Sequence, residues 1–84
     1  MTYTVFIRKS VQKALTKITP PFKDRMIDAI RGLADIPRPA GVKELSGREA
    51  WRIRVGDYRA IYEIHDNRLV IMVIVIGHRR EVYR

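Results

Sequence analysis

Three arginines near the middle of the chain have the types and spacing of an anion-binding site. Arg52 and Arg54 alternate with apolar residues, and Arg59 comes shortly after a Gly56-Asp57 pair. Alternation places Arg52 and Arg54 on one face of a strand. Glycine in the first position of a two-residue loop is typical of a type II′ hairpin turn. A turn of this kind predicts that Arg54 lies directly opposite Arg59 in a β-hairpin.

The predicted pairing of two arginines has a cost in stability. Like charges directly opposite each other on neighbouring strands are destabilising, so stability alone would favour Thr or Glu at one of these positions. The guanidinium group suits phosphate because its planar set of donors binds two oxygens at once. We interpret the cluster of Arg52, Arg54 and Arg59 as an anion site. The alternative is a solvated face on which Glu63 or water screens the charges.

The overall charge also favours an anionic partner. Of the 84 residues, 17 are Lys or Arg and 9 are Asp or Glu, which gives a formal net charge of +8. Residues 45–84 contain eight arginines and no lysine. Basic surfaces attract the phosphates of nucleic acids, and arginine binds phosphates and stacked bases better than lysine does.

The composition argues against several other kinds of site. The chain has no cysteine, and its two histidines, His65 and His78, have no spacing that predicts a metal site. We therefore expect no metal and no small-molecule cofactor. The longest apolar run has eight residues, whereas about 20 are needed to cross a bilayer. With no signal peptide visible, we expect a cytoplasmic protein without a membrane segment.

The end of the chain adds further candidate groups. His78, Arg79 and Arg80 follow a long apolar run, and Tyr83 is the penultimate residue. An unperturbed histidine has a pKa of about 6.5, which makes His78 the near-neutral acid–base group closest to the arginines. Arg79 and Arg80 are within reach of the same side of the sheet. Tyr83 has three possible roles: a base stack, a shield for a phosphate site, or a core anchor.

The elements that position these residues predict a single α+β domain, residues 1–84. We expect an edge or central strand at residues 2–7, two helices, a loop at 36–41, and then an antiparallel sheet. Ser10 is the expected N-cap of the first helix. The apolar stripes of the two helices are Val11, Ala14, Leu15 and Ile18, and Phe22, Met26, Ala29, Ile30 and Leu33.

The predicted hairpin separates a core face from the arginine face. The face opposite the arginines is apolar or aromatic, and we expect the helices to cover it: Trp51, Ile53, Val55, Tyr58, Ala60 and Tyr62. A second turn at residues 66–67 leads into the apolar run 69–76. This run is apolar on both faces, which is typical of a central strand, and we expect Gly77 to end it.

The segments 51–64 and 77–83 together resemble the RelE branch of the RelE/ParE toxin superfamily. The resemblance spans essentially the whole chain, including the element order β-α-α-β-β-β. It implies a toxin of a type II toxin–antitoxin pair. RelE-like members cleave mRNA in the ribosomal A site, whereas ParE-like members inhibit DNA gyrase.

The resemblance also assigns roles to residues by position. It implies catalytic roles for five residues: Arg52, Arg54, Arg59, Arg79 and Tyr83. We expect Arg80 and His78, which lie beside Arg79 in the sequence, to contact the substrate. The best-known member has lysines at the positions of Arg52 and Arg54. Guanidinium groups stay protonated, so neither arginine is expected to act as a general base. The segment from Gly77 to Tyr83 is two residues shorter than in that member, which leaves either Arg79 or Arg80 as the family arginine.

The resulting hypothesis is a metal-independent endoribonuclease that acts on mRNA in the 70S ribosome and inhibits translation. The expected partner is a cognate acidic antitoxin that packs on the helices or the sheet and covers or distorts the arginine face. Masking of the charges would require antitoxin carboxylates near Arg54 and Arg59. Steric exclusion from the A site, which we favour together with partial masking, would need only hydrophobic contact with the edges of Val11, Leu15 and Leu33. Two alternatives are a ParE-like gyrase inhibitor and a catalytically inactive module that binds RNA or the antitoxin.

Overall fold

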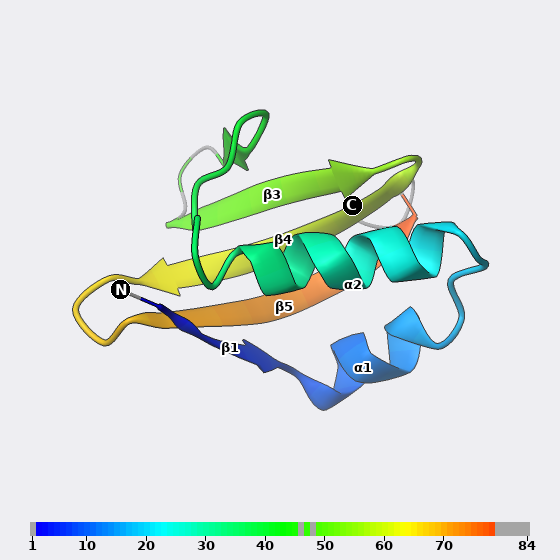
Figure 1. Ribbon diagram of the computed structural model, residues 1–84, viewed down its shortest axis with the longest axis horizontal. Helices are drawn as coiled ribbons and strands as arrows, with labels where there is room; N and C mark the ends of the chain where they lie inside the picture. Colours follow the sequence, from blue (N-terminus) through cyan, green and yellow to red (C-terminus); the bar gives the residue numbers. More distant parts are fainter. Residues whose placement is uncertain (1, 46, 48, 79–84) are drawn as a thin grey trace.

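A five-stranded sheet with two helices on one face forms the fold (Figure 1). The computed structural model describes residues 2–45, 47 and 49–78. The strand order in the sheet is β1-β5-β4-β3-β2. The elements in chain order are β1 (Thr4–Ile7), α1 (Lys9–Leu15), α2 (Phe22–Gly32), β2 (Lys43–Glu44), β3 (Ala50–Val55), β4 (Tyr58–His65) and β5 (Val70–His78). The α+β class is confirmed.

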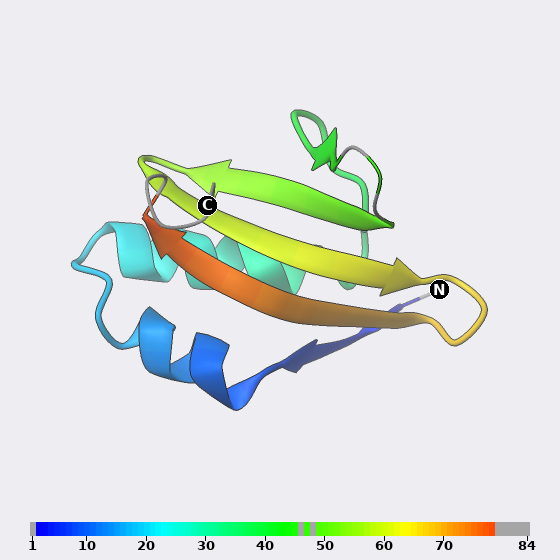
Figure 2. The same ribbon diagram turned by 180° about the vertical axis from the view of Figure 1, so that it is seen from behind.

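The sheet is antiparallel from β2 to β5, as predicted, and β1 adds a parallel edge next to β5. Between its two neighbours β1 and β4, β5 is the interior strand that its apolar run indicated. The two-residue β2, at the opposite edge from β1, was not separately predicted. Figure 2 shows the face of the sheet that the helices leave uncovered. No helix in the described ranges is long and apolar enough to span a membrane.

The helices begin and end close to the predicted residues and bury the predicted stripes. Val11, Leu15 and Ile18 are buried, as are Met26, Ile30 and Leu33 of the second stripe. They pack against the inner face of the sheet, which contributes Ile53, Ala60, Tyr62, Ile71, Val73 and Ile76 to the same core. The core face predicted for the hairpin is confirmed.

The prediction of Ser10 as the N-cap of α1 is wrong. The cap position is taken by Arg8, without a capping hydrogen bond from its side chain. The first helical hydrogen bond runs from the Gln12 N–H to the Arg8 carbonyl oxygen at 2.9 Å, so Ser10 lies inside the first turn. The Gln12 side chain also donates to the Ile7 carbonyl oxygen at 2.9 Å, which ties the helix start to β1.

A network of polar side chains fixes the loop after α2 at the far end of the sheet. Asp66 accepts hydrogen bonds from the Tyr3 hydroxyl at 2.6 Å and from Arg38 at 3.0 Å. The Arg38 guanidinium also lies 4.9 Å from the ring centre of Trp51. The Tyr62 hydroxyl donates to the carbonyl oxygen of Pro37 at 2.7 Å, and burial raises the pKa of Tyr62 to about 12.

Acid should weaken this network in a way that depends on Asp66. Hydrogen bonds from Arg38 and then from Tyr3 hold the pKa of Asp66 below its usual value. Because the pKa of Asp66 is lower in the folded than in the unfolded protein, the ionised carboxylate stabilises the fold at pH values above the unfolded-state pKa of about 3.9. This stabilisation is lost as the pH falls through the folded-state pKa. Urea unfolding between pH 2 and 7 measures the effect. The variant Asp66→Asn should lose part of the acid dependence, and an unchanged slope in that variant would contradict the assignment.

The hairpin turn between β3 and β4 requires glycine at its first position. Gly56 has φ of +59°, whereas Asp57 does not have a positive φ, as a type II′ turn requires. A Cβ atom on Gly56 would lie 2.7 Å from Cε1 of Phe22. The turn residue therefore also packs directly on the first residue of α2, which ties the hairpin to the helix.

We expect Gly56→Ala to lower the free energy of unfolding by about 1–3 kcal/mol, because a side chain is strained in this backbone region and meets Phe22. The matched control is Gly32→Ala, where an added Cβ meets nothing within 4 Å. A helical Gly32→Ala should instead stabilise the protein by about 0.5–1 kcal/mol. Thermal or urea unfolding of both variants tests the pair, and equal effects would refute the role of the turn.

Candidate active site

The hairpin brings two arginines face to face, as predicted. Arg54 lies opposite Arg59 in the pairing of β3 with β4, and Arg52 lies opposite Ile61. The next strand, β5, places Gly77 opposite Arg59. Residues paired across a sheet share a face, so Arg54, Arg59 and Gly77 form one row across three strands. We call this the arginine row, and it lies on the face of the sheet opposite the core residues Ile53, Ala60 and Ile76.

Gly77 does not end β5, contrary to the prediction. The strand continues through Gly77 to His78, and a bulge at Ile74 changes which residues face Arg59. Uninterrupted pairing from Tyr62 and Val73 onward would have placed Ile76 opposite Arg59. The extra residue moves Gly77 there instead. A position without a side chain therefore borders Arg59.

The two paired arginines differ in environment. Arg59 is only 7% exposed, and it is the buried charged residue of the part that the structure describes. Arg54 is exposed and Arg52 is half-buried. A small apolar cluster of Ala50, Ile61 and Ile74 occupies the same face. Because Arg59 is buried, its stem is already fixed when an anion binds at the row.

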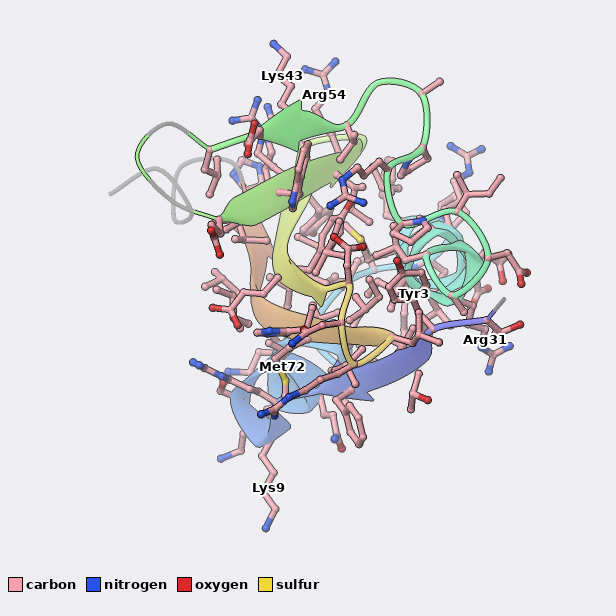
Figure 3. All side chains as sticks on the ribbon, turned by 90° about the vertical axis from the view of Figure 1, so that its left-hand side faces the viewer. Tyr3, Lys9, Arg31, Lys43, Arg54 and Met72 are labelled. Atoms are coloured by element: carbon pink, nitrogen blue, oxygen red, sulfur yellow. The ribbon has the colours of Figure 1, made fainter. Side chains whose placement is uncertain are left out.

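Lys43 is a basic residue of this site that we did not predict. It pairs with Arg52 across β2 and β3, which places the two side chains on one face. Figure 3 shows Lys43 and Arg54 projecting from the same end of the molecule. Predicting Lys43 from the sequence would have required pairing segment 43–44 with segment 51–52. A strand of two residues is too short to show an alternating pattern, so the sequence gives no sign of this pairing.

A groove of about 730 Å³ lies beside the arginine row, between α2, the loop after it and β3. Lys43, Arg52 and Arg54 supply its cations, and no carboxylate occurs among the described residues that line it. Its remaining lining is mostly small or apolar: Ala29, Gly32, Ile36, Pro39, Ala40, Gly41, Val42 and Ile53. The groove thus combines a positive rim with an apolar wall.

His78 lies on the other face of the sheet from the arginine row. It pairs with Tyr58, and the two rings meet edge to face with centroids 5.8 Å apart. Tyr58 belongs to the core face and packs near Phe22, with ring centroids 6.0 Å apart. The structure therefore does not bring His78 together with Arg54 and Arg59, and a substrate contact by His78 remains a prediction for a different surface.

The other predicted site residues, Arg79, Arg80 and Tyr83, lie outside the described residues. Their roles remain predictions. The described part of the site is thus an electrostatic one, made of Arg52, Arg54, Arg59 and Lys43. Fixed cations of this kind stabilise negative charge that develops on a phosphate during reaction. They do not remove a proton, because guanidinium groups stay protonated.

Comparisons with solved structures identify the fold. A chain of the archaeal RelE-RelB complex from Pyrococcus horikoshii OT3 superposes with a TM-score of 0.84, at 33% identity over 94% of this chain and 97% of that one. A mutant of E. coli toxin RelE in the free state superposes with a TM-score of 0.80, at 23% identity over 99% of this chain and 92% of that one. The fold is that of the RelE toxins.

Sequence comparisons give the family. Residues 5–83 match the model of the family described as the ParE toxin of the type II toxin-antitoxin system, parDE. Toxin RelG of Mycobacterium tuberculosis is 28% identical over 88 aligned positions, covering 100% of this chain and 99% of the relative. The chain belongs to the RelE/ParE superfamily of type II toxin–antitoxin toxins, in its RelE-like branch.

Proposed function

We propose that this toxin cleaves mRNA bound in the ribosomal A site and thereby inhibits translation in the cytoplasm. The observation that carries the proposal is the arginine row, in which Arg59 is buried opposite the exposed Arg54. Two opposed arginines destabilise the hairpin, and a phosphate between them would convert that repulsion into binding. RNA presents such phosphates at every nucleotide.

The proposed reaction is a transesterification within the RNA. The 2′-oxygen bonds to the adjacent phosphorus, and the bond from phosphorus to the 5′-oxygen breaks. The 2′-hydroxyl proton passes to a base, and the 5′-oxygen takes a proton from an acid, which leaves a 2′,3′-cyclic phosphate and a 5′-hydroxyl. Arg54 and Arg59 would brace the scissile phosphate and stabilise its transition-state charge, while Arg52 would hold the neighbouring backbone.

The remaining predicted residues would complete this site. Arg79 or Arg80 would contact the same backbone, and Tyr83 would stack on a base or take part in proton transfer. The reaction needs neither a metal nor another cofactor in this scheme, because positioning and fixed charges supply the catalysis. The ribosome would present the substrate strand to the exposed Arg54.

The proposed partner that controls this activity is a cognate acidic antitoxin. The Pyrococcus horikoshii relative was solved as a RelE-RelB complex, and a chain of net charge +8 attracts an acidic partner. The expected contacts with Val11, Leu15 and Leu33 are wrong, because these side chains are at most 8% exposed. The groove beside the arginine row is a better surface for the antitoxin, since Ile36 at its wall is 61% exposed.

Gyrase inhibition is the second candidate function, because the matched family model is described as the ParE toxin. A catalytically inactive module that binds RNA or the antitoxin is the third. Primer extension on mRNA from cells expressing the chain separates the candidates. We expect cleavage within translated codons soon after induction. Intact mRNA together with lost DNA supercoiling activity of gyrase would favour the ParE-like function, and intact mRNA with normal supercoiling would favour the inactive module.

A further inference from the structure

A second groove, of about 500 Å³, lies between α1 and the end of the sheet where β4 begins and β5 ends. We call it the α1 groove. The residues that matter for its chemistry are Lys13 and Lys17 from the side of α1, and Tyr58, Gly77 and His78 from the strands. None of these residues except Gly77 belongs to the arginine row.

The described lining of the α1 groove carries positive charge and no carboxylate. Lys13 lies in α1 and Lys17 in the turn that follows it, and both are exposed and line the groove. Neither forms an ion pair with the described part of the chain. The described lining also includes the ring of His78. Such a groove attracts an anion.

The groove also offers aromatic surface. The rings of Tyr58 and His78 meet edge to face at an interplanar angle of 82°, so the faces of the two rings point in nearly perpendicular directions. Both residues are half-buried, which holds the rings in place while part of their surface stays accessible. Aromatic rings next to cations are the combination that binds single-stranded nucleic acid, because bases stack on the rings and phosphates contact the cations.

The α1 groove is continuous with the arginine row at one residue. Gly77 lies opposite Arg59 in the sheet and also lines the α1 groove. Since Gly77 has no side chain, nothing projects from this position between the two sites. A flexible polymer that is bound at Arg59 and crosses β5 at Gly77 would therefore reach Lys13 and Lys17. The carboxylates of a short acidic peptide could bind the lysines, but such a peptide has no base to stack on the rings of Tyr58 and His78.

We propose that the α1 groove binds a further nucleotide of the substrate RNA, beyond the dinucleotide whose phosphate the arginine row holds. Lys13 and Lys17 contact its phosphate, and the pair of Tyr58 and His78 contacts its base. The inference rests on the proposed function in one respect, namely that the ligand is RNA. It assigns His78 to substrate binding on the helix side of the sheet, away from the reacting phosphate.

Binding of uncleavable RNA tests the inference apart from catalysis. The probes are fluorescein-labelled 2′-O-methyl oligouridines of two and six nucleotides, which lack the attacking hydroxyl. We expect the double variant Lys13→Glu/Lys17→Glu to weaken binding of the hexanucleotide about tenfold. The slope of log Kd against the logarithm of the salt concentration should fall by about one. Binding of the dinucleotide, which occupies only the arginine row, should change less than threefold.

The matched control is Lys9→Glu/Arg25→Glu. It makes the same change in net charge at two exposed residues that line neither groove, and Figure 3 shows Lys9 at the opposite end of the view from Arg54. We expect this control to weaken both oligonucleotides equally and by less than threefold. A tenfold loss in the control would show that net charge alone explains the binding and would overturn the inference.

Two further measurements decide the nature of the ligand. The ring proton signals of His78 and Tyr58 in NMR spectra should shift with the hexanucleotide and not with the dinucleotide. A hexaglutamate peptide that displaced the hexanucleotide and shifted the same signals would show selection for charge alone and would refute a nucleotide site. A chain that binds the hexanucleotide as expected but cleaves no mRNA on ribosomes would contradict the proposed function while leaving the groove assignment intact.

Discussion

Replacing Arg59 with methionine should lower the rate of mRNA cleavage on ribosomes by about 10²–10³-fold, the usual loss when one fixed donor to a developing negative charge is removed. Arg59 is 7% exposed and faces Arg54 and Gly77 across the sheet. Methionine keeps most of the apolar stem, so the variant removes the guanidinium while filling the space. Single-turnover cleavage of mRNA in programmed ribosomes measures the effect.

The control for this variant is Arg68→Met, which removes the same group from an exposed position in the turn after β4. Cleavage by Arg68→Met should stay within about threefold of the original rate, because exposed charges far from the site are screened by salt. The urea midpoint of Arg59→Met should be no lower than that of the parent. Loss of activity accompanied by unfolding, or an equal loss in Arg68→Met, would contradict a catalytic role for Arg59.

Replacing Arg54 with alanine should separate activity from stability. We expect cleavage to fall by about 10²–10³-fold, while the free energy of unfolding rises by about 0.2–1 kcal/mol, because a like-charge neighbour of Arg59 is removed. Arg54 is exposed, so truncation leaves no cavity. Ribosome cleavage and urea unfolding of one preparation give both numbers.

A structural role for Arg54 would give the opposite pattern. If the residue stabilised the hairpin, the alanine variant would unfold at lower urea and would lose activity in proportion. The variant Arg54→Lys sharpens the comparison, since it keeps the charge and loses the planar pair of donors. Activity of Arg54→Lys between those of the parent and of Arg54→Ala would support bidentate phosphate binding. Full activity would show that charge alone is sufficient.

Local rules were enough to predict the hairpin, because its turn and its alternation both act over a few residues. Gly56 sets the turn, the turn sets the pairing of Arg54 with Arg59, and the pairing sets the faces. The buried faces of the helices could also be predicted, because apolar residues that recur with the helical period of 3.6 residues line one side of a helix. The α+β class and the arginine row followed from these two signals.

The parts that could not be predicted depend on contacts distant in sequence. The run 69–76 is apolar on both faces, so its alternation does not say which residues face the arginines. The bulge at Ile74 decides this: it places Gly77 beside Arg59 and turns His78 toward Tyr58. Likewise, Lys43 joins the site through a two-residue strand that exists only because β3 is beside it.

The central claim is that the arginine row acts on a phosphate of ribosome-bound mRNA. The most direct test incubates the purified toxin with an end-labelled mRNA, alone and in programmed 70S ribosomes, and analyses the new ends. We predict cleavage in the A-site codon only when ribosomes are present, an upstream fragment ending in a 2′,3′-cyclic phosphate, and loss of this product in Arg59→Met. Intact mRNA in the ribosome sample, or equal cleavage by Arg59→Met, would contradict the claim.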